Sequence, residues 1–234
     1  MHPLHNIIWK ALTTRQGEFG ECSDQACRFM PEVTSLAGFR EPTPEGYSSL
    51  SGLPGAPGTI ALFLDAPYEK RAGWELVASA ALLQMVCEDG RAAPAARDAR
   101  DPELIELIEL GDADSPEMIE LTALTKPGPF GKRTHELGTY LGIRRDGKLV
   151  AMAGERLKVP GHTEVSAVCT HPDHTGHGYA RILMSEVMRR IRVRGERPFL
   201  HVREDNVRAI ALYERLGFEA RVKLHLAVLR KDPV

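Results

Sequence analysis

The chain is poor in several features that would mark a special class of protein. Its 234 residues include only four cysteines and two tryptophans, aromatic residues make up 6%, and 30 basic against 32 acidic side chains leave a formal charge of −2. Such a balance creates no global field for a polyanion, so nucleic acid is not an expected partner. No apolar run reaches membrane-spanning length, and the first residues lack the charged start and apolar run of a signal peptide. We therefore expect a cytoplasmic protein without a membrane partner.

The cysteines stand at positions 22, 27, 87 and 169, with no Cys-x-x-Cys pair among them. Their density is far below that of a disulfide scaffold, so the sequence predicts four reduced thiols. The remaining composition is that of a globular protein, because an apolar fraction of 43% is ample for a packed core. The length allows one large domain or two small ones.

The most informative stretch runs from Thr163 to Ala180. It contains a short apolar run typical of a strand, a turn marked by Pro172 and two glycines, after which apolar residues recur at helical spacing as far as Ile191. A helix therefore begins at the glycines. Its first N–H groups and its dipole favour an anion, and Gly176 and Gly178 have no Cβ to hold a ligand away from the main chain. The stretch predicts a phosphate or pyrophosphate site, although glycines before a helix are also common in turns that bind no ligand.

A second helix is predicted shortly afterwards. Residues 198–203 form a strand-length run, Asn206 is a good helix N-cap, and Gly217-Phe218 supplies a glycine C-cap followed by an apolar contact. The segments Thr175-Gly-His-Gly-Tyr-Ala180 and Asp205-Asn-Val-Arg-Ala-Ile-Ala-Leu-Tyr-Glu-Arg-Leu-Gly-Phe218 together resemble the acetyl-CoA-binding core of the GNAT superfamily, the Gcn5-related N-acetyltransferases. The resemblance covers about the last half of the chain.

The resemblance implies a GNAT-type α/β fold, a mixed and largely antiparallel central sheet flanked by helices, for residues 102–234. It places the pyrophosphate of acetyl-CoA on the glycine loop and implies that the following residues contact this cofactor: Val168, Cys169, Thr170, Thr175, Gly176, His177, Gly178, Tyr179, Ala180 and Asn206. One position departs from the family pattern, because Thr175 stands where Arg or Gln is usual. His174 and His177 are candidates for the missing donor.

Catalysis by such a fold needs a base for the amine and an acid for the departing thiolate. A primary amine has a pKa near ~10.4, so it must lose a proton before it attacks. Glu164 resembles the base that several GNAT enzymes carry on the corresponding strand, and Glu155 is the second candidate; a strand-edge carboxylate facing water is the plain alternative. The resemblance makes Tyr213 the general acid, with core packing as its alternative role. The backbone N–H of Val168 or Cys169 is the predicted oxyanion donor.

Three histidines spaced three apart, His171, His174 and His177, raise the question of a zinc site. They straddle a proline and the glycine loop and so share no helix face. Phosphate contact or solvent exposure is the simpler interpretation, and no metal is expected.

The first half of the chain carries no motif. Its patterns predict a helix over 6–16, an irregular loop over 41–58, a strand over 59–65, and an apolar segment over 74–87 for which periodicity does not decide between helix and strand. The alanine- and arginine-rich stretch 88–101 is the predicted boundary between domains of residues 1–101 and 102–234. The first domain is a candidate for a degenerate second GNAT copy, as in the glycine N-acyltransferase branch, but no internal repeat is strong enough to show it.

The second half should contain more regular elements. The patterns predict strands over 104–110, 164–170, 198–203 and 222–228, a helix over 115–124, and a hairpin of 140–145 with 148–157 around Asp146-Gly147. The proline- and glycine-rich stretch 126–131 is predicted to be a rigid loop, either covering the acceptor site or merely connecting two elements.

The leading functional hypothesis is an N-acyltransferase that moves an acetyl or short acyl group from CoA to a primary amine of a small molecule, amino acid or peptide. A catalytically silent acyl-CoA-binding module with a partner-docking N-terminal half is the alternative. A Rossmann dehydrogenase fits less well, because the glycine loop lies late in the chain and follows no first βα unit. A homodimer is kept as a candidate assembly.

Overall fold

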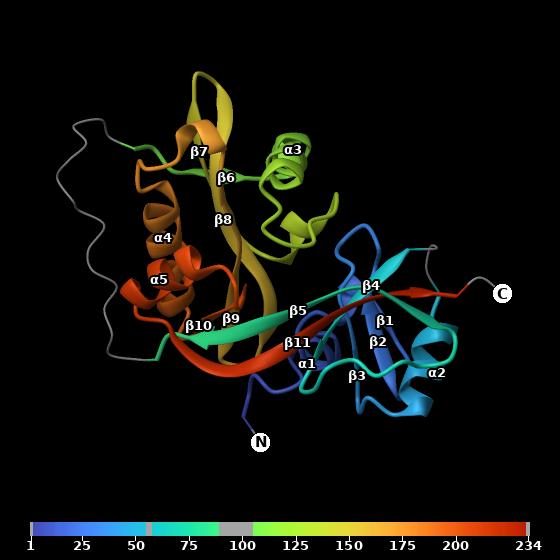
Figure 1. Ribbon diagram of the computed structural model, residues 1–234. Coiled ribbons are helices and arrows are strands. Elements are labelled where there is room, and N and C mark those ends of the chain that lie inside the picture. Colours follow the sequence, from blue (N-terminus) through green and yellow to red (C-terminus); the bar gives the residue numbers. More distant parts are fainter. Residues whose placement is uncertain (1, 55–57, 89–104, 233–234) are drawn as a thin grey trace.

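A computed structural model describes residues 2–54, 58–88 and 105–232. Its main feature is an eight-stranded sheet (Figure 1). In spatial order the strands are β4 (Thr59–Leu64), β11 (Glu219–Lys231), β5 (Trp74–Val86), β10 (Arg197–Arg203), β9 (His162–Thr170), β8 (Lys148–Val159), β7 (Tyr140–Arg145) and β6 (Ile108–Leu110). Neighbours are antiparallel except β9 and β10, which run parallel. The predicted mixed, largely antiparallel sheet is confirmed.

A smaller sheet and five helices complete the described chain. The sheet consists of β1 (Gly20–Cys22), β2 (Ala26–Phe29) and β3 (Ala37–Phe39), and the helices are α1 (Ile7–Thr14), α2 (Pro44–Gly52), α3 (Ser115–Thr125), α4 (Tyr179–Val193) and α5 (Val207–Arg215). Short 3₁₀ turns cover Gly17–Phe19, Asp112–Asp114, Thr134–Leu137 and Pro172–His174.

Helices cover both faces of the large sheet. Successive side chains of a strand point to opposite faces, and β10 shows the result: Leu200 packs in the core beneath α4 and α5, while its neighbour Phe199 packs in the core beneath α1. In β8, Met152 faces the separate cluster beneath α3. Figure 1 shows α4 and α5 on one side of the sheet and α3 on the other.

Strands from both predicted domains are interleaved in this sheet. β5, from the first hundred residues, lies between β10 and β11 and pairs with both. The described part of the first 101 residues thus contributes β4 and β5 to the large sheet. The predicted boundary does not divide the sheet, and most of the boundary segment, residues 89–101, lies outside the described residues. The ambiguous segment 74–87 is a strand.

The prediction of an irregular loop over 41–58 is wrong, because α2 occupies its middle. The Thr43 hydroxyl accepts a hydrogen bond from the Gly46 N–H at 3.3 Å, and Pro44 fills the first turn, where a missing N–H costs nothing. These local start signals were present in the sequence but were outweighed by the density of prolines and glycines.

The predicted hairpin is confirmed, with Asp146 and Gly147 at φ 51° and 79° in its turn. The first strand of the second half is shorter than expected, Ile108–Leu110, and the last is longer, Glu219–Lys231. The first helix also forms, but the Asn6 side chain does not cap it. Within the described ranges, no helix is both long and apolar enough to span a membrane.

The prediction of four reduced cysteines is wrong for two of them. Cys22 and Cys27 face each other across the β1–β2 ladder and form a disulfide, whereas Cys87 and Cys169 are buried and belong to no disulfide. Their spacing of five residues is not a recognised sequence signal, and only the hairpin between them brings the two sulfurs together.

Candidate active site

The glycine loop adopts the predicted conformation. Gly176 and Gly178 have φ angles of 88° and 77°, a region that L-residues with a Cβ rarely occupy, and a Cβ added to either one would enter open space. α4 begins at Tyr179, directly after Gly178, as the prediction of a helix beginning at the glycines requires. The His177 ring stacks on Tyr179, 5.4 Å between centroids, and does not line the cavity described next. The main chain is therefore open to a ligand at the positive end of α4.

A cavity of about 390 Å³ lies between this loop, the end of β9 and α5. Its lining contains Val168, Cys169, Thr170, Thr175, Gly176, Gly178, Tyr179, Ala180, Asn206 and Tyr213, so the structure brings together every predicted cofactor contact except His177. Sequence reasoning missed the basic members of the wall, Arg181, Arg208 and Arg215. A signal existed, because Arg208 and Arg215 are seven residues apart and so share one face of α5.

The cavity opens because β9 and β10 separate. Their parallel pairing ends at the Phe199–Glu164 pair, although both strands continue. Beyond that point β9 contains a bulge, where Ala167 has a φ of 51° and the register with β8 shifts. The bulge lies next to Val168, a predicted oxyanion donor, which lines two cavities.

The second cavity, of about 600 Å³, lies on the other side of this opening. Both halves of the chain build it: Thr59, Ala61 and Phe63 of β4, Leu226 and Val228 of β11, the loop Lys126 to Pro129, and the splayed parts of β9 and β10. The proline- and glycine-rich loop is thus part of a cavity wall and not only a connector. Val168, Asn206 and Tyr213 line both cavities, so the two spaces meet at these residues.

Tyr213 stands where the cavities meet. Its side chain is 9% exposed and packs edge-on against Phe218, with 6.2 Å between ring centroids. Burial raises the pKa of its phenol to about 12, so the hydroxyl stays protonated at neutral pH. Asn206 is the N-cap of α5, since its side-chain oxygen accepts from the Ala209 N–H at 3.2 Å.

Glu164, the first candidate for the base, lies behind the wall of the second cavity. Its carboxylate accepts hydrogen bonds from Nε and Nη2 of Arg156 at 2.9 and 2.8 Å, from the Leu157 N–H at 3.2 Å, and it lies 2.7 Å from Nδ1 of His201. Burial opposes ionisation, but Arg156 and His201 outweigh it and lower the pKa of Glu164 to about 2. A carboxylate with four hydrogen-bond partners and such a pKa has little capacity to take a proton from an amine.

The same network fixes the tautomer of His201. Gln84 accepts from Arg221 with its oxygen and donates to the Leu4 carbonyl with its nitrogen, so that nitrogen is also the donor to Nε2 of His201 at 2.9 Å. The imidazole proton therefore lies on Nδ1, facing Glu164. Glu155, the second candidate base, is equally enclosed, because Arg194 and Lys158 contact its two oxygens at 2.7 and 3.1 Å.

The three histidines of the loop region do not converge. His171 and His174 face each other across the 3₁₀ turn, 5.7 Å between ring centroids, while His177 lies on Tyr179. Among the residues that the structure describes, no group of three His, Cys, Asp or Glu side chains is arranged to hold a metal ion.

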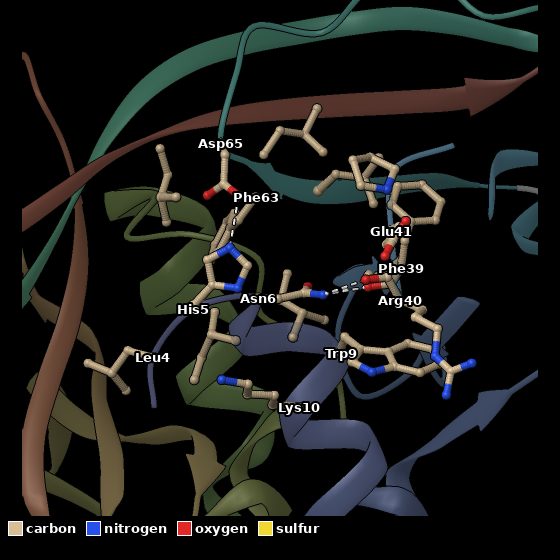
Figure 2. Close-up of a pocket in the computed structure, with 18 of the residues that line it drawn as sticks. Leu4, His5, Asn6, Trp9, Lys10, Phe39, Arg40, Glu41, Phe63 and Asp65 are labelled. Atoms are coloured by element: carbon tan, nitrogen blue, oxygen red, sulfur yellow. Dashed lines mark hydrogen bonds and ion pairs between the residues drawn. The ribbon is translucent and has the colours of Figure 1, made fainter. Parts of the chain in front are cut away.

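A third cavity, of about 470 Å³, contains none of the predicted site residues (Figure 2). It lies between α1, β3 and β4, where the Asn6 amide donates to the Phe39 and Arg40 carbonyls at 2.7 and 3.2 Å. Phe63 lines both this cavity and the second one.

The comparisons with known proteins agree with this geometry. The family described as FR47-like protein matches residues 140–226. The N-alpha-acetyltransferase RimI of Mycobacterium tuberculosis is 34% identical over 130 residues, which cover 51% of this chain and 81% of RimI. The crystal structure of a GNAT-family protein from Novosphingobium aromaticivorans is 37% identical, covers 100% of both chains and superposes with a TM-score of 0.88.

The chain belongs to the GNAT superfamily. It is a CoA-dependent N-acetyltransferase, and GNAT acetyltransferases use acetyl-CoA as their co-substrate. A GCN5-related N-acetyltransferase from Kribbella flavida, 18% identical over 98% of this chain and 94% of its own, has a TM-score of 0.61 and so shares the fold. The predicted superfamily is confirmed, while membership of the glycine N-acyltransferase branch stays a prediction.

Proposed function

We propose that this GNAT enzyme transfers an acetyl group from acetyl-CoA to the primary amine of a small molecule that enters the second cavity. The observation that carries the proposal is the meeting of the two cavities at Val168, Asn206 and Tyr213. The first cavity offers the glycine loop and three arginines to the phosphates of CoA. The second is large enough for a small acceptor and reaches the same junction.

In this proposal the main chain of β9 and the side chain of Tyr213 have different tasks. The main-chain N–H at the β9 bulge, at Val168 or Cys169, binds the thioester carbonyl and then the oxyanion. Tyr213 donates a hydrogen bond to the departing sulfur, which resembles a free thiol with a pKa near ~8.5. Because the pKa of Tyr213 is higher than that of the thiol, the phenol stabilises the thiolate mainly by donating a hydrogen bond and not by giving up its proton.

We infer that the proton of the amine leaves to solvent, and that Glu164 does not accept it directly. Arg156, Leu157 and His201 already occupy the carboxylate. The pH dependence of a Glu164→Gln variant separates the two roles. A base role predicts a loss of turnover that shrinks at high pH, where the amine deprotonates in solution; a positioning role predicts a loss that does not.

A thiol-release assay with acetyl-CoA and a panel of amines tests the proposed reaction. We expect CoA release that depends on both substrates, with mass spectrometry showing acetyl on the amine nitrogen. Reactions without amine measure background hydrolysis. CoA binding without turnover on any amine would favour the alternative of an acyl-CoA-binding module.

A further inference from the structure

Arg156 lines the second cavity, and one edge of its guanidinium has no hydrogen-bond partner in the described chain. The side chain is 7% exposed and lines that cavity, while Glu164 holds its Nε and Nη2. Nη1 makes no hydrogen bond within the described ranges. It points toward the loop on the cavity wall, since a Cβ placed on Gly128 would lie 3.8 Å away. A buried arginine held by one carboxylate thus keeps donors for a second anion.

None of the described residues that line this cavity is acidic. Its ionised side chains are Arg156, Lys126 and Arg203, of which Arg203 is paired with Asp205 at 2.6 Å, and Lys126 is exposed and has no ion-pair partner in the described chain. Glu164 contributes its charge only from behind the wall. Although burial disfavours the charged form, Glu164 more than compensates and raises the pKa of Arg156.

We propose that the acceptor is a small amine that also carries a carboxylate, such as a free amino acid, and that Arg156 binds this carboxylate through Nη1. The inference rests on the proposed function and narrows its substrate class. An arginine already fixed by a carboxylate loses little further freedom on binding, and its planar guanidinium can donate to the oxygens of a second carboxylate. Arg156 is then a specificity-determining residue, and Glu164 is the positioning residue that orients it.

The arrangement also favours the reactive form of the acceptor. An ammonium ion is stabilised by a nearby carboxylate and destabilised by nearby cations. Because no acidic side chain from the described part of the chain lines the cavity, the bound ammonium gains no partner of opposite charge there. Deprotonation of the acceptor is thereby easier than at an acidic site, which fits a site without an accessible base.

The first test compares three acceptors on the wild-type enzyme: an α-amino acid, its carboxamide, and the amine that remains when the carboxylate is removed. We expect kcat/KM to be about 10- to 100-fold higher for the amino acid, the range of one hydrogen-bonded charge. Equal values for the three acceptors would overturn the inference and leave the proposed function intact. No turnover with any of them, or with the wider panel, would overturn the proposed function itself.

The second test removes the N–H donors of the Arg156 guanidinium. Arg156→Met alone would strand a buried carboxylate, so it is combined with Glu164→Gln; Arg156→Lys, which keeps the charge but not the paired donors, is the second variant. Both should lose the preference for the amino acid, so that its kcat/KM falls to about the value for the neutral amine on the same variant. Lys126→Met is the control, since it removes an exposed cation of the same wall and should retain the preference. A preference that survives in the Arg156 variants, or disappears only in Lys126→Met, would overturn the assignment. If neither Arg156 variant folds, the wild-type comparison still decides the substrate class.

Discussion

Asn206 and Tyr213 are seven residues apart at the start and near the end of α5, and both line both cavities. Seven residues make two helical turns, so the two side chains share one face of the helix. Because Asn206 sets where α5 begins, it also sets the position of Tyr213 two turns later, where the two cavities meet. The sequence pattern of an asparagine cap followed seven residues later by a tyrosine therefore places both side chains at the candidate site.

Tyr213→Phe separates chemistry from packing at this junction. The change deletes one hydroxyl and keeps the ring that packs against Phe218. We expect kcat to fall about 10- to 10³-fold, while the affinity for acetyl-CoA stays within a few-fold of wild type. A thermal melt, a CoA titration and steady-state rates on one preparation check this. Full activity would restrict Tyr213 to packing, and a lost affinity would make it a cofactor contact.

Gly178→Glu should abolish CoA binding, because a Cβ and a negative charge would occupy the space over the first turn of α4. Gly161→Glu is a matched control. Gly161 has a φ of 75°, against 77° for Gly178, and its Cβ would likewise meet open space, but it lies in the β8–β9 turn away from the lining of either cavity. Both variants should be less stable by about 1–2 kcal/mol, because each places a residue with a Cβ in the left-handed conformation. Calorimetry with CoA should then distinguish them, and equal affinities would show that the glycine loop does not hold the phosphates.

Much of the first cavity was predictable from the sequence, because its signals are local. The glycines of the loop and the Asn206 cap each act within a few residues, and the resemblance to the GNAT superfamily indicated that both belong to a cofactor site. The second cavity was not predictable in this way. Its walls include β4 and β11, and β5 enters the sheet between strands that lie more than a hundred residues later in the chain.

The role of Glu164 shows the same limit. Its place at the start of a strand was predicted, but whether a carboxylate is free or paired depends on residues that arrive from other strands. Here Arg156 comes from β8 and His201 from β10, and both contact the carboxylate of Glu164. No spacing in the sequence relates these three residues.

The Cys22–Cys27 disulfide should contribute stability without contributing to catalysis. It closes a loop of only a few residues, for which the chain-entropy relation gives about 2 kcal/mol. The double variant Cys22→Ser/Cys27→Ser should therefore melt at a lower temperature, and a reductant should lower the melting temperature of the wild type but not of the variant. Acetyl transfer at low temperature should be equal in both. A reductant effect of the same size on the variant would point to another cause.

The Arg156–Glu164 pair predicts how stability depends on pH. In the folded protein the pKa of Glu164 is lowered to about 2 from its ordinary value of 4.5, so the pair contributes fully above pH 4.5 and its contribution is lost as the pH falls toward 2. Glu164→Gln removes the charge and leaves Arg156 buried without its partner. We expect the free energy of unfolding of Glu164→Gln to be about 3 kcal/mol lower than that of the wild type at neutral pH, which is in the range measured when one partner of a buried ion pair is removed.

Glu186→Gln is the matched control for this effect. Arg189 and Arg190 lower the pKa of Glu186 to about 2 as well, but its side chain is 23% exposed on α4, where ion pairs are worth about 0–1 kcal/mol. Urea unfolding of the three proteins from pH 7 to pH 3 is the measurement. The difference between wild type and Glu164→Gln should be large at pH 7 and shrink below pH 4.5, whereas the Glu186→Gln difference should be small throughout. A Glu164→Gln difference that is small at pH 7, or that does not change with pH, would mean that the buried pair is not the source of this stability.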